Sequence, residues 1–175
     1  MRTVLRRSAA RVTAVVVIAL VALCGCTPPT TGGGGTDYSK CPTPGAGDVR
    51  VAMVVDATAL GGTSNVVCVV VAQGASGVTA LYARAARLGT TPPRFDASGL
   101  LCGIDGAPAA PACGTVGPSG YQYWSYWVGG STWTYAAVGP ASRSMQDGTV
   151  EGWRFQLGGA NTAPSTSASF SQLVS

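Results

Sequence analysis

The chain has 175 residues, of which 11 are Lys or Arg, 7 are Asp or Glu and none is His, giving a formal net charge of +4. The excess of bases comes from the start of the chain, because removing Arg2, Arg6, Arg7 and Arg11 leaves seven bases against seven acids. A neutral domain lacks the clustered positive charge that phosphate backbones attract, and a chain without histidine cannot build a Ser-His or Cys-His nucleophile. Nucleic-acid binding and histidine-dependent catalysis are therefore excluded.

The first segment in chain order is a basic start followed by the apolar run 14–23 (AVVVIALVAL). The run is too short to span a bilayer as a helix and is typical of a secretory signal peptide. It ends in Leu-Cys-Gly-Cys at 23–26, a lipobox pattern, which predicts removal of residues 1–25 and lipidation of Cys26. We expect the mature protein on the outer face of the cell membrane, anchored by lipid. Ordinary secretion is the alternative.

A flexible spacer is expected after the lipidated cysteine, over residues 26–47. Its sequence from 27 to 39 (TPPTTGGGGTDYS) is rich in Pro, Thr and Gly and contributes almost no core-forming side chains. We expect the folded domain over residues 48–157.

The domain is predicted to open with a hairpin and a helix. Residues 49–57 (VRVAMVVDA) alternate in part, and 66–72 (VVCVVVA) form a continuous β-branched run typical of a central strand covered on both faces. The next segment, 77–88, has apolar residues at helical spacing, Ser76 as a candidate N-cap and Gly89 as a stop.

Strands dominate the second half of the prediction, at 100–104, 121–128, 132–136 and 149–157. In the last strand Gly152 is interpreted as a β-bulge. The tail 158–175 is rich in Ser, Thr and Ala and is expected to be disordered. This order of elements predicts an α+β fold with a β-grasp-like mixed sheet and one main helix.

Four cysteines remain after the signal peptide and Cys26, and in an exported chain they are expected to form two disulfides. Three connectivities exist. The short segment GIDGAPAAPA favours Cys102 with Cys113, which leaves Cys41 with Cys68. No CxxC pair and no histidine is present for a zinc site, so no metal is predicted.

The stretch 121–155 contains all four tryptophans of the chain. Alternate residues of a strand share a face, so rings from 121–128 and from the neighbouring strand can form an exposed platform that stacks on a small ligand. Two arginines could donate bidentate hydrogen bonds to a carboxylate or phosphate there. In the alternative, both faces are covered and the arginines are solvated or paired with acids. The residues assigned to this site are Tyr123, Trp127, Trp133, Tyr135, Arg143 and Arg154.

Three segments, CGIDG (102–106), YWSYWVGGSTWTYAAVGPASRS (123–144) and DGTVEGWRF (147–155), resemble a family of actinobacterial exported proteins and lipoproteins. More distantly, they resemble the β-grasp-like C-terminal domain of transcobalamin and intrinsic factor, although Gly129-Gly130 replaces the Asn-Gly of that pattern. The resemblance implies a domain without catalytic machinery that helps to hold a small ligand, a corrinoid in the vitamin carriers.

We therefore expect a non-catalytic, lipid-anchored binding protein that needs no cofactor and captures a small ligand, such as a corrinoid or another vitamin, for a membrane transporter. One alternative is an interaction protein, an accessory subunit of a transporter or cell-envelope complex. Another is a secreted protease inhibitor with a protruding loop at 102–113. Catalysis by paired carboxylates is the least favoured, because Asp105 and Asp147 each precede a glycine in a predicted turn.

Overall fold

The computed structural model describes residues 36–174. The predicted signal peptide, the lipidated Cys26 and the spacer up to residue 35 lie outside the described residues. Within the described part of the chain, no helix is both long and apolar enough to cross a membrane.

The elements follow one another in nearly the predicted order, and the bounds of the strands agree with the predicted ones to within a few residues. The strands and helices are β1 (Asp48–Asp56), η1 (Thr58–Leu60), β2 (Ser64–Ala72), α1 (Gly77–Leu88), β3 (Arg94–Phe95), β4 (Leu101–Gly103), β5 (Thr115–Gly117), β6 (Gly120–Val128), β7 (Thr134–Tyr135), η2 (Pro140–Ser142), β8 (Thr149–Gln156) and α2 (Phe170–Leu173).

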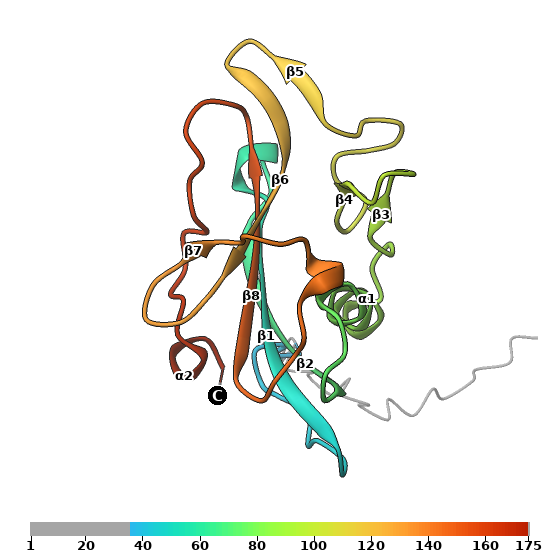
Figure 1. Cartoon of the computed structure of the whole chain (residues 1–175), viewed down its shortest axis with the longest axis vertical. Helices are drawn as coiled ribbons and strands as arrows, with labels where there is room; N and C mark the ends of the chain where they lie inside the picture. Colours follow the sequence, from blue (N-terminus) through green and yellow to red (C-terminus); the bar gives the residue numbers. More distant parts are fainter. Residues whose placement is uncertain (1–35, 175) are drawn as a thin grey trace, which may run out of the picture. The chain divides into compact units, whose positions relative to one another are not determined.

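A six-stranded mixed sheet runs in the order β2-β1-β8-β6-β5, with β7 also paired to β6. Strand β1 is antiparallel to β2 and parallel to β8, so the two ends of the domain meet at the centre of the sheet. A hairpin, a helix and a return to a parallel central strand make the β-grasp arrangement, which confirms the predicted α+β fold. The helix α1 lies on one face of the sheet, and the C-terminal segment with α2 lies on the other (Figure 1).

Strand β2 was predicted to be central, and this prediction is wrong because β2 is an edge strand. Its outer edge is partly covered by the N-terminal segment, where the Cys68 amide donates to the Tyr38 carbonyl over 2.9 Å. The β-branched residues of β2 reflect burial of the faces of the strand. Val67 and Val69, for example, are almost fully buried. A strand can therefore be covered on its faces while one of its edges is at the rim of the sheet.

The helix α1 begins and ends where the sequence predicts. The Ser76 hydroxyl accepts from the Thr79 amide over 3.1 Å, and Gly89 adopts the left-handed conformation (φ 66°) that ends the helix. The residues Ala80, Leu81 and Ala85 are buried, and Ala80 and Leu81 belong to the core that joins the helix to the sheet.

Both predicted disulfides are confirmed, Cys41 with Cys68 and Cys102 with Cys113. The second disulfide closes a loop whose carbonyl groups contact the Arg94 side chain. One guanidinium nitrogen of Arg94 lies within hydrogen-bond distance of three loop carbonyls, at 2.6 Å from Ala112, 3.2 Å from Pro108 and 3.5 Å from Cys102.

The predicted limits of the domain are too narrow at both ends. At the N-terminal side Tyr38 packs against the core, so part of the expected spacer belongs to the fold. The tail was predicted to be disordered, but Pro164, Ala168 and Leu173 are buried on the sheet face opposite α1. The polar composition of the tail predicted disorder because the segment has few apolar side chains. The segment is instead held by hydrogen bonds to the sheet, which are described below.

The predicted bulge at Gly152 is also wrong. Gly152 pairs in continuous register with Val54 on one side and Trp127 on the other. A glycine is needed there for space, since a Cβ atom would lie 2.7 Å from the Trp133 ring and 3.1 Å from Cγ of Pro164. Without a bulge, the side chains of β8 alternate, and Leu157 falls outside the strand and is exposed.

Candidate functional site

The predicted aromatic platform is largely covered. Trp127 is only 7% exposed, its indole nitrogen donates to the Ser125 hydroxyl over 2.8 Å, and its ring meets Tyr135 edge to face. Trp133 is half-buried and donates to the Thr166 carbonyl over 2.9 Å, under the C-terminal segment. The two tryptophans therefore pack within the domain, and the prediction that they are exposed is wrong.

The two tyrosines of the predicted platform lie at its solvent-facing end. The hydroxyls of Tyr123 and Tyr135 are 3.2 Å apart, and Tyr123 donates to the Asn161 side chain over 2.8 Å. Burial and the hydrogen bond with Tyr123 raise the pKa of Tyr135 to about 12, so the Tyr135 ring is a neutral phenol at physiological pH. Tyr135 is 44% exposed, which leaves one ring of the predicted set accessible.

The two predicted arginines lie on opposite faces of the sheet and do not converge. Arg154 donates to the Ala163 carbonyl over 2.7 Å and lies 3.5 Å from an Asp56 oxygen, on the face covered by the C-terminal segment. Arg143 donates to Glu151 over 3.1 Å, on the α1 face. The prediction of one site with both arginines is therefore wrong, because it placed them without the register of β8.

A buried carboxyl group on the α1 face was not predicted. The Glu151 side chain is fully buried and accepts hydrogen bonds from the Tyr126 hydroxyl and from Arg143. Burial raises the pKa of Glu151 to about 8. Strict alternation along β8 puts Glu151 on the same face as Trp153 and Phe155, so that pattern could have revealed it if no bulge had been assumed.

An apolar pocket of about 330 Å³ opens beside this group. Its walls come from the first turn of α1, the 95–99 segment, and Gly139 with the first residues of η2. They comprise Val78, Phe95, Ser98, Gly99, Gly139, Pro140 and Ala141. The buried carboxyl lies just behind this wall, because the place of a Cβ on Gly77 is 3.2 Å both from the Tyr126 hydroxyl and from Cβ of Pro140.

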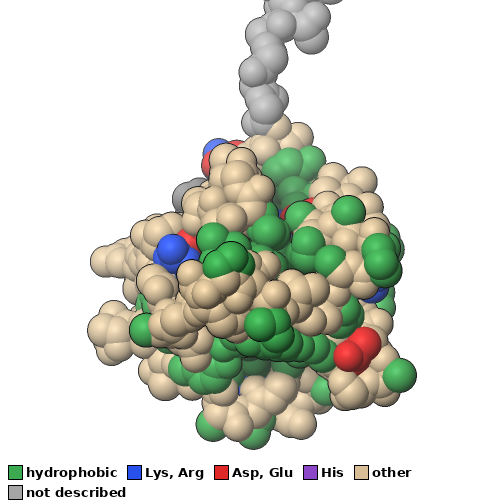
Figure 2. All heavy atoms as spheres, turned by 90° about the horizontal axis from the view of Figure 1, so that it is seen from above, with side chains coloured by type: hydrophobic (Ala, Val, Ile, Leu, Met, Phe, Trp, Pro, Cys, Tyr) green, Lys and Arg blue, Asp and Glu red, His purple; other side chains and the backbone are tan. Residues whose placement is uncertain are grey.

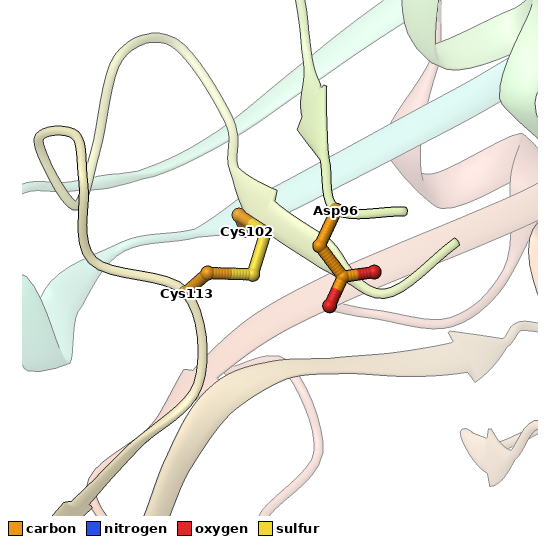
Figure 3. Close-up of side chains that lie close together, drawn as sticks. All are labelled: Asp96, Cys102 and Cys113. Carbon is orange, nitrogen blue, oxygen red and sulfur yellow. A yellow bond between two sulfur atoms is a disulfide. The ribbon is translucent and has the colours of Figure 1, made fainter. Parts of the chain in front are cut away.

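One cluster has the spacing of metal ligands but not the chemistry. The carboxylate of Asp96 and the sulfurs of Cys102 and Cys113 lie within 4.8 Å of one another (Figure 3). The sulfurs are joined in a disulfide and cannot act as thiolates. The Asp96 oxygen already accepts from the Ser98 and Leu100 amides, which stabilises its own turn. These three residues do not form a metal site.

Three other acids, Asp56, Asp105 and Asp147, each have a partner in the fold. Asp105 contacts Arg84 over 2.8 Å and also accepts from Thr90, while Asp147 accepts from Arg50 at the surface. Asp56 is fully buried and accepts from Thr58 and from Ser165. None of these carboxylates lines the apolar pocket.

These features define an α+β domain of the β-grasp type, crosslinked by two disulfides, with an apolar pocket beside α1. A family model described as "SCO2322-like domain" matches residues 116–175, which span β5 to the C-terminal segment and make up less than half of the chain. The match is consistent with the predicted kinship to an actinobacterial, Streptomyces-type family. No curated protein matches the chain, and the resemblance to transcobalamin and intrinsic factor stays a prediction.

Proposed function

We propose that this protein is a non-catalytic extracytoplasmic binding module that captures a small ligand in the pocket between α1 and η2. The pocket carries the proposal, since it is concave and apolar and its volume of about 330 Å³ is within the range of small-molecule sites. The aromatic strand face, where we first expected the ligand, is covered by the chain itself.

The walls of the pocket indicate the chemistry of the ligand. Val78, Phe95 and Pro140 supply apolar surface, and Ser98 supplies a hydroxyl near the rim. Such a site suits a compact, mainly apolar group with one polar edge. A corrinoid is far larger than this pocket and would be held by one side group, so a smaller vitamin-like ligand fits the space better.

The absence of catalysis in this proposal rests on chemistry. The whole sequence has no histidine, and the carboxylates described above are engaged in turns, ion pairs or buried hydrogen bonds. Asp96, next to the pocket, accepts from the Ser98 hydroxyl over 2.7 Å, and Glu151 lies behind the wall and has no exposed surface. Glu151 supports the wall through Tyr126.

We further propose that Cys26 carries a lipid that holds this module on the outer face of the membrane, where it serves an uptake system. A Cys26→Ala variant should appear in the culture medium, as measured by fractionation and immunoblotting. Retention of a processed Cys26→Ala form in the membrane fraction would contradict the anchor.

A second candidate function, protein interaction, is favoured by the end of the domain where β5 and β6 meet. Val116 is 84% exposed, and Tyr121, its cross-strand neighbour, is 46% exposed. In the view from above, hydrophobic side chains form several patches and charged side chains are few (Figure 2). Such a surface is typical of a contact with an accessory protein of a transporter or envelope complex.

Ligand capture can be tested with a matched pair of substitutions in the exposed loop before β8. Ala141→Trp should fill the pocket, whereas Ala137→Trp adds the same ring outside it. We would screen the domain against aromatic fragments, vitamins and cobalamin by thermal shift and follow any hit by NMR. A ligand whose binding is lost only in Ala141→Trp supports the proposal. Binding that both variants retain would place the ligand elsewhere, and no binding across the panel would favour the interaction protein.

A further inference from the structure

The C-terminal segment 162–168 is held to the sheet mainly through its main chain. Five hydrogen bonds join main-chain atoms of this segment to side chains of the domain. They run from Gln156 to the Thr162 carbonyl (2.7 Å), from the Thr162 amide to Gln156 (3.2 Å), from Arg154 to the Ala163 carbonyl (2.7 Å), from the Ser165 amide to Asp56 (3.0 Å) and from Trp133 to the Thr166 carbonyl (2.9 Å).

Two of the side chains that make these bonds are also held by residues outside the segment. An Asp56 oxygen accepts from the Thr58 amide over 3.1 Å, and the Gln156 amide donates to the buried Ser125 hydroxyl over 2.7 Å. Arg154 lies against Asp56, at 3.5 Å between nitrogen and oxygen. Preorganised donors and acceptors lower the entropy that binding has to overcome. The face is therefore built as a receptor for an extended main chain.

The buried side chains of the segment on this face are small. The Pro164 ring lies over Gly152, where even a Cβ atom would be 3.1 Å from its Cγ. Ala168 is 5% exposed, Thr162 is exposed, and the Ser165 hydroxyl donates to Asp56 over 2.9 Å. This face thus accepts an extended segment with Pro or Ala at the buried positions, a hydroxyl opposite Asp56 and polar residues elsewhere.

The resident segment has the features of an exchangeable occupant. It follows Gly158 and Gly159, both with positive φ (101° and 76°). Few of its side chains are buried, so its opening free energy should be well below that of the core. A main-chain receptor filled by a segment of low stability can accept another segment of the same chemistry.

We propose that this face, formed by Asp56, Trp133, Arg154 and Gln156, is a peptide-binding site that residues 162–168 fill in cis. In trans it takes an extended segment rich in Ala, Pro, Ser and Thr from another protein. This site lies on the opposite face of the sheet from the apolar pocket and is independent of the function proposed above. The resident segment competes at a high effective concentration, so binding in trans is measurable once the connection is cut.

The test starts from the full chain, with a protease site inserted after Gly159 and cleaved after folding. A fluorescent peptide with the sequence of residues 160–175 is then added, and anisotropy is recorded against protein concentration. We expect saturable exchange, with competition by the unlabelled peptide and by other Ala/Pro/Ser/Thr-rich peptides. Circular dichroism should show that the cleaved domain stays folded after the segment leaves.

Two peptide variants with the same charge change provide the control. Ala168→Asp places a carboxylate at a buried position and should weaken binding by about tenfold or more. Ala160→Asp changes an exposed position and should bind like the parent. Equal effects of the two changes would overturn the proposal. It would also be overturned if the cleaved segment never exchanged, if only its own sequence could bind, or if the domain unfolded on its release.

Discussion

The two faces of the sheet are stabilised by different interactions. Against α1, large apolar side chains fill the interior, and Trp153, Met53 and Leu81 are almost fully excluded from water. Against the C-terminal segment, a small apolar cluster around Val54, Val150 and Leu173 is supplemented by hydrogen bonds to main-chain atoms. The first face depends on burial and the second largely on directed polar contacts, so the two should respond differently to substitution.

Removing the largest buried ring should produce the greatest loss on the α1 face. Trp153→Ala deletes a fully buried indole that stacks on Tyr126 at 5.1 Å, and we expect the free energy of unfolding to fall by about 3–5 kcal/mol. Chemical denaturation measures this change. The matched Trp133→Ala substitution, on the half-buried ring under the C-terminal segment, should have a clearly smaller effect. Equal losses would remove the distinction between the two faces.

Substitution of the buried acid under the C-terminal segment should rank second. Burial opposes ionisation of Asp56, but hydrogen bonds from Thr58 and Ser165 outweigh it and lower its pKa. Asp56→Asn should destabilise the domain by about 2–3 kcal/mol, since hydrogen bonds to a charged acceptor are lost. Amide exchange in 162–168 should rise most. The exposed Asp147→Asn serves as the control and should leave that exchange unchanged.

The pKa shift of Asp56 also determines whether the stability of the domain rises or falls with pH in the acidic range. A carboxyl whose folded pKa lies below its unfolded value contributes stability above the unfolded pKa, and this contribution disappears as the pH falls through the folded pKa. The wild type should therefore lose more stability than Asp56→Asn on acidification below about pH 4. A constant difference between the two proteins across that range would contradict the assigned role of the ionised group.

The buried acid on the α1 face should behave in the opposite way. Burial raises the pKa of Glu151 to about 8, so the folded state holds a proton that the unfolded state releases at lower pH. Stability should therefore fall as the pH rises, by about 2 kcal/mol between pH 6 and 8. Glu151→Gln should flatten this part of the profile in thermal unfolding. An unchanged slope in the variant would show that another group is responsible.

The smallest expected effect comes from adding one methyl group between the sheet and the C-terminal segment. In Gly152→Ala the new Cβ would lie 2.7 Å from the Trp133 ring, which must shift and loosen the segment. We expect a loss of roughly 1–2 kcal/mol and faster exchange at residues 162–168. Gly139→Ala, where a Cβ meets nothing within 4 Å, is the matched control. Slower exchange at α1 than at the segment should persist in both variants.

The α1 side of the fold was predictable because its signals are local. Ser76 and Gly89 mark the ends of the helix, the partial alternation over 49–57 marks a strand, and the short loop between Cys102 and Cys113 predicts their disulfide. Each of these patterns reflects burial or backbone geometry within a few neighbouring residues, and each was confirmed.

The other side was not predictable in the same way because its partners are far apart in the sequence. The contact between Asp56 and Ser165 spans 109 positions. Neither residue is apolar, so the hydrophobic periodicity of the sequence does not indicate this contact. The candidate site was misplaced for the same reason, since Trp133 lies under the C-terminal segment and Trp127 packs against Ser125 and Tyr135. The pocket beside α1 combines residues from three loops and elements, and its walls are unremarkable residues in the sequence.

The Cys41–Cys68 crosslink determines how a mechanical load would enter the domain. A pull on the N-terminal side of the chain passes from Cys41 directly through the sulfur bridge to the middle of β2, bypassing the contacts of residues 42–47. Strand β2 is paired with β1 over its full length. The force is therefore shared among many backbone hydrogen bonds and does not act first on residues 42–47. The covalent bridge thus carries a load applied at Cys41 into a pair of strands at full register.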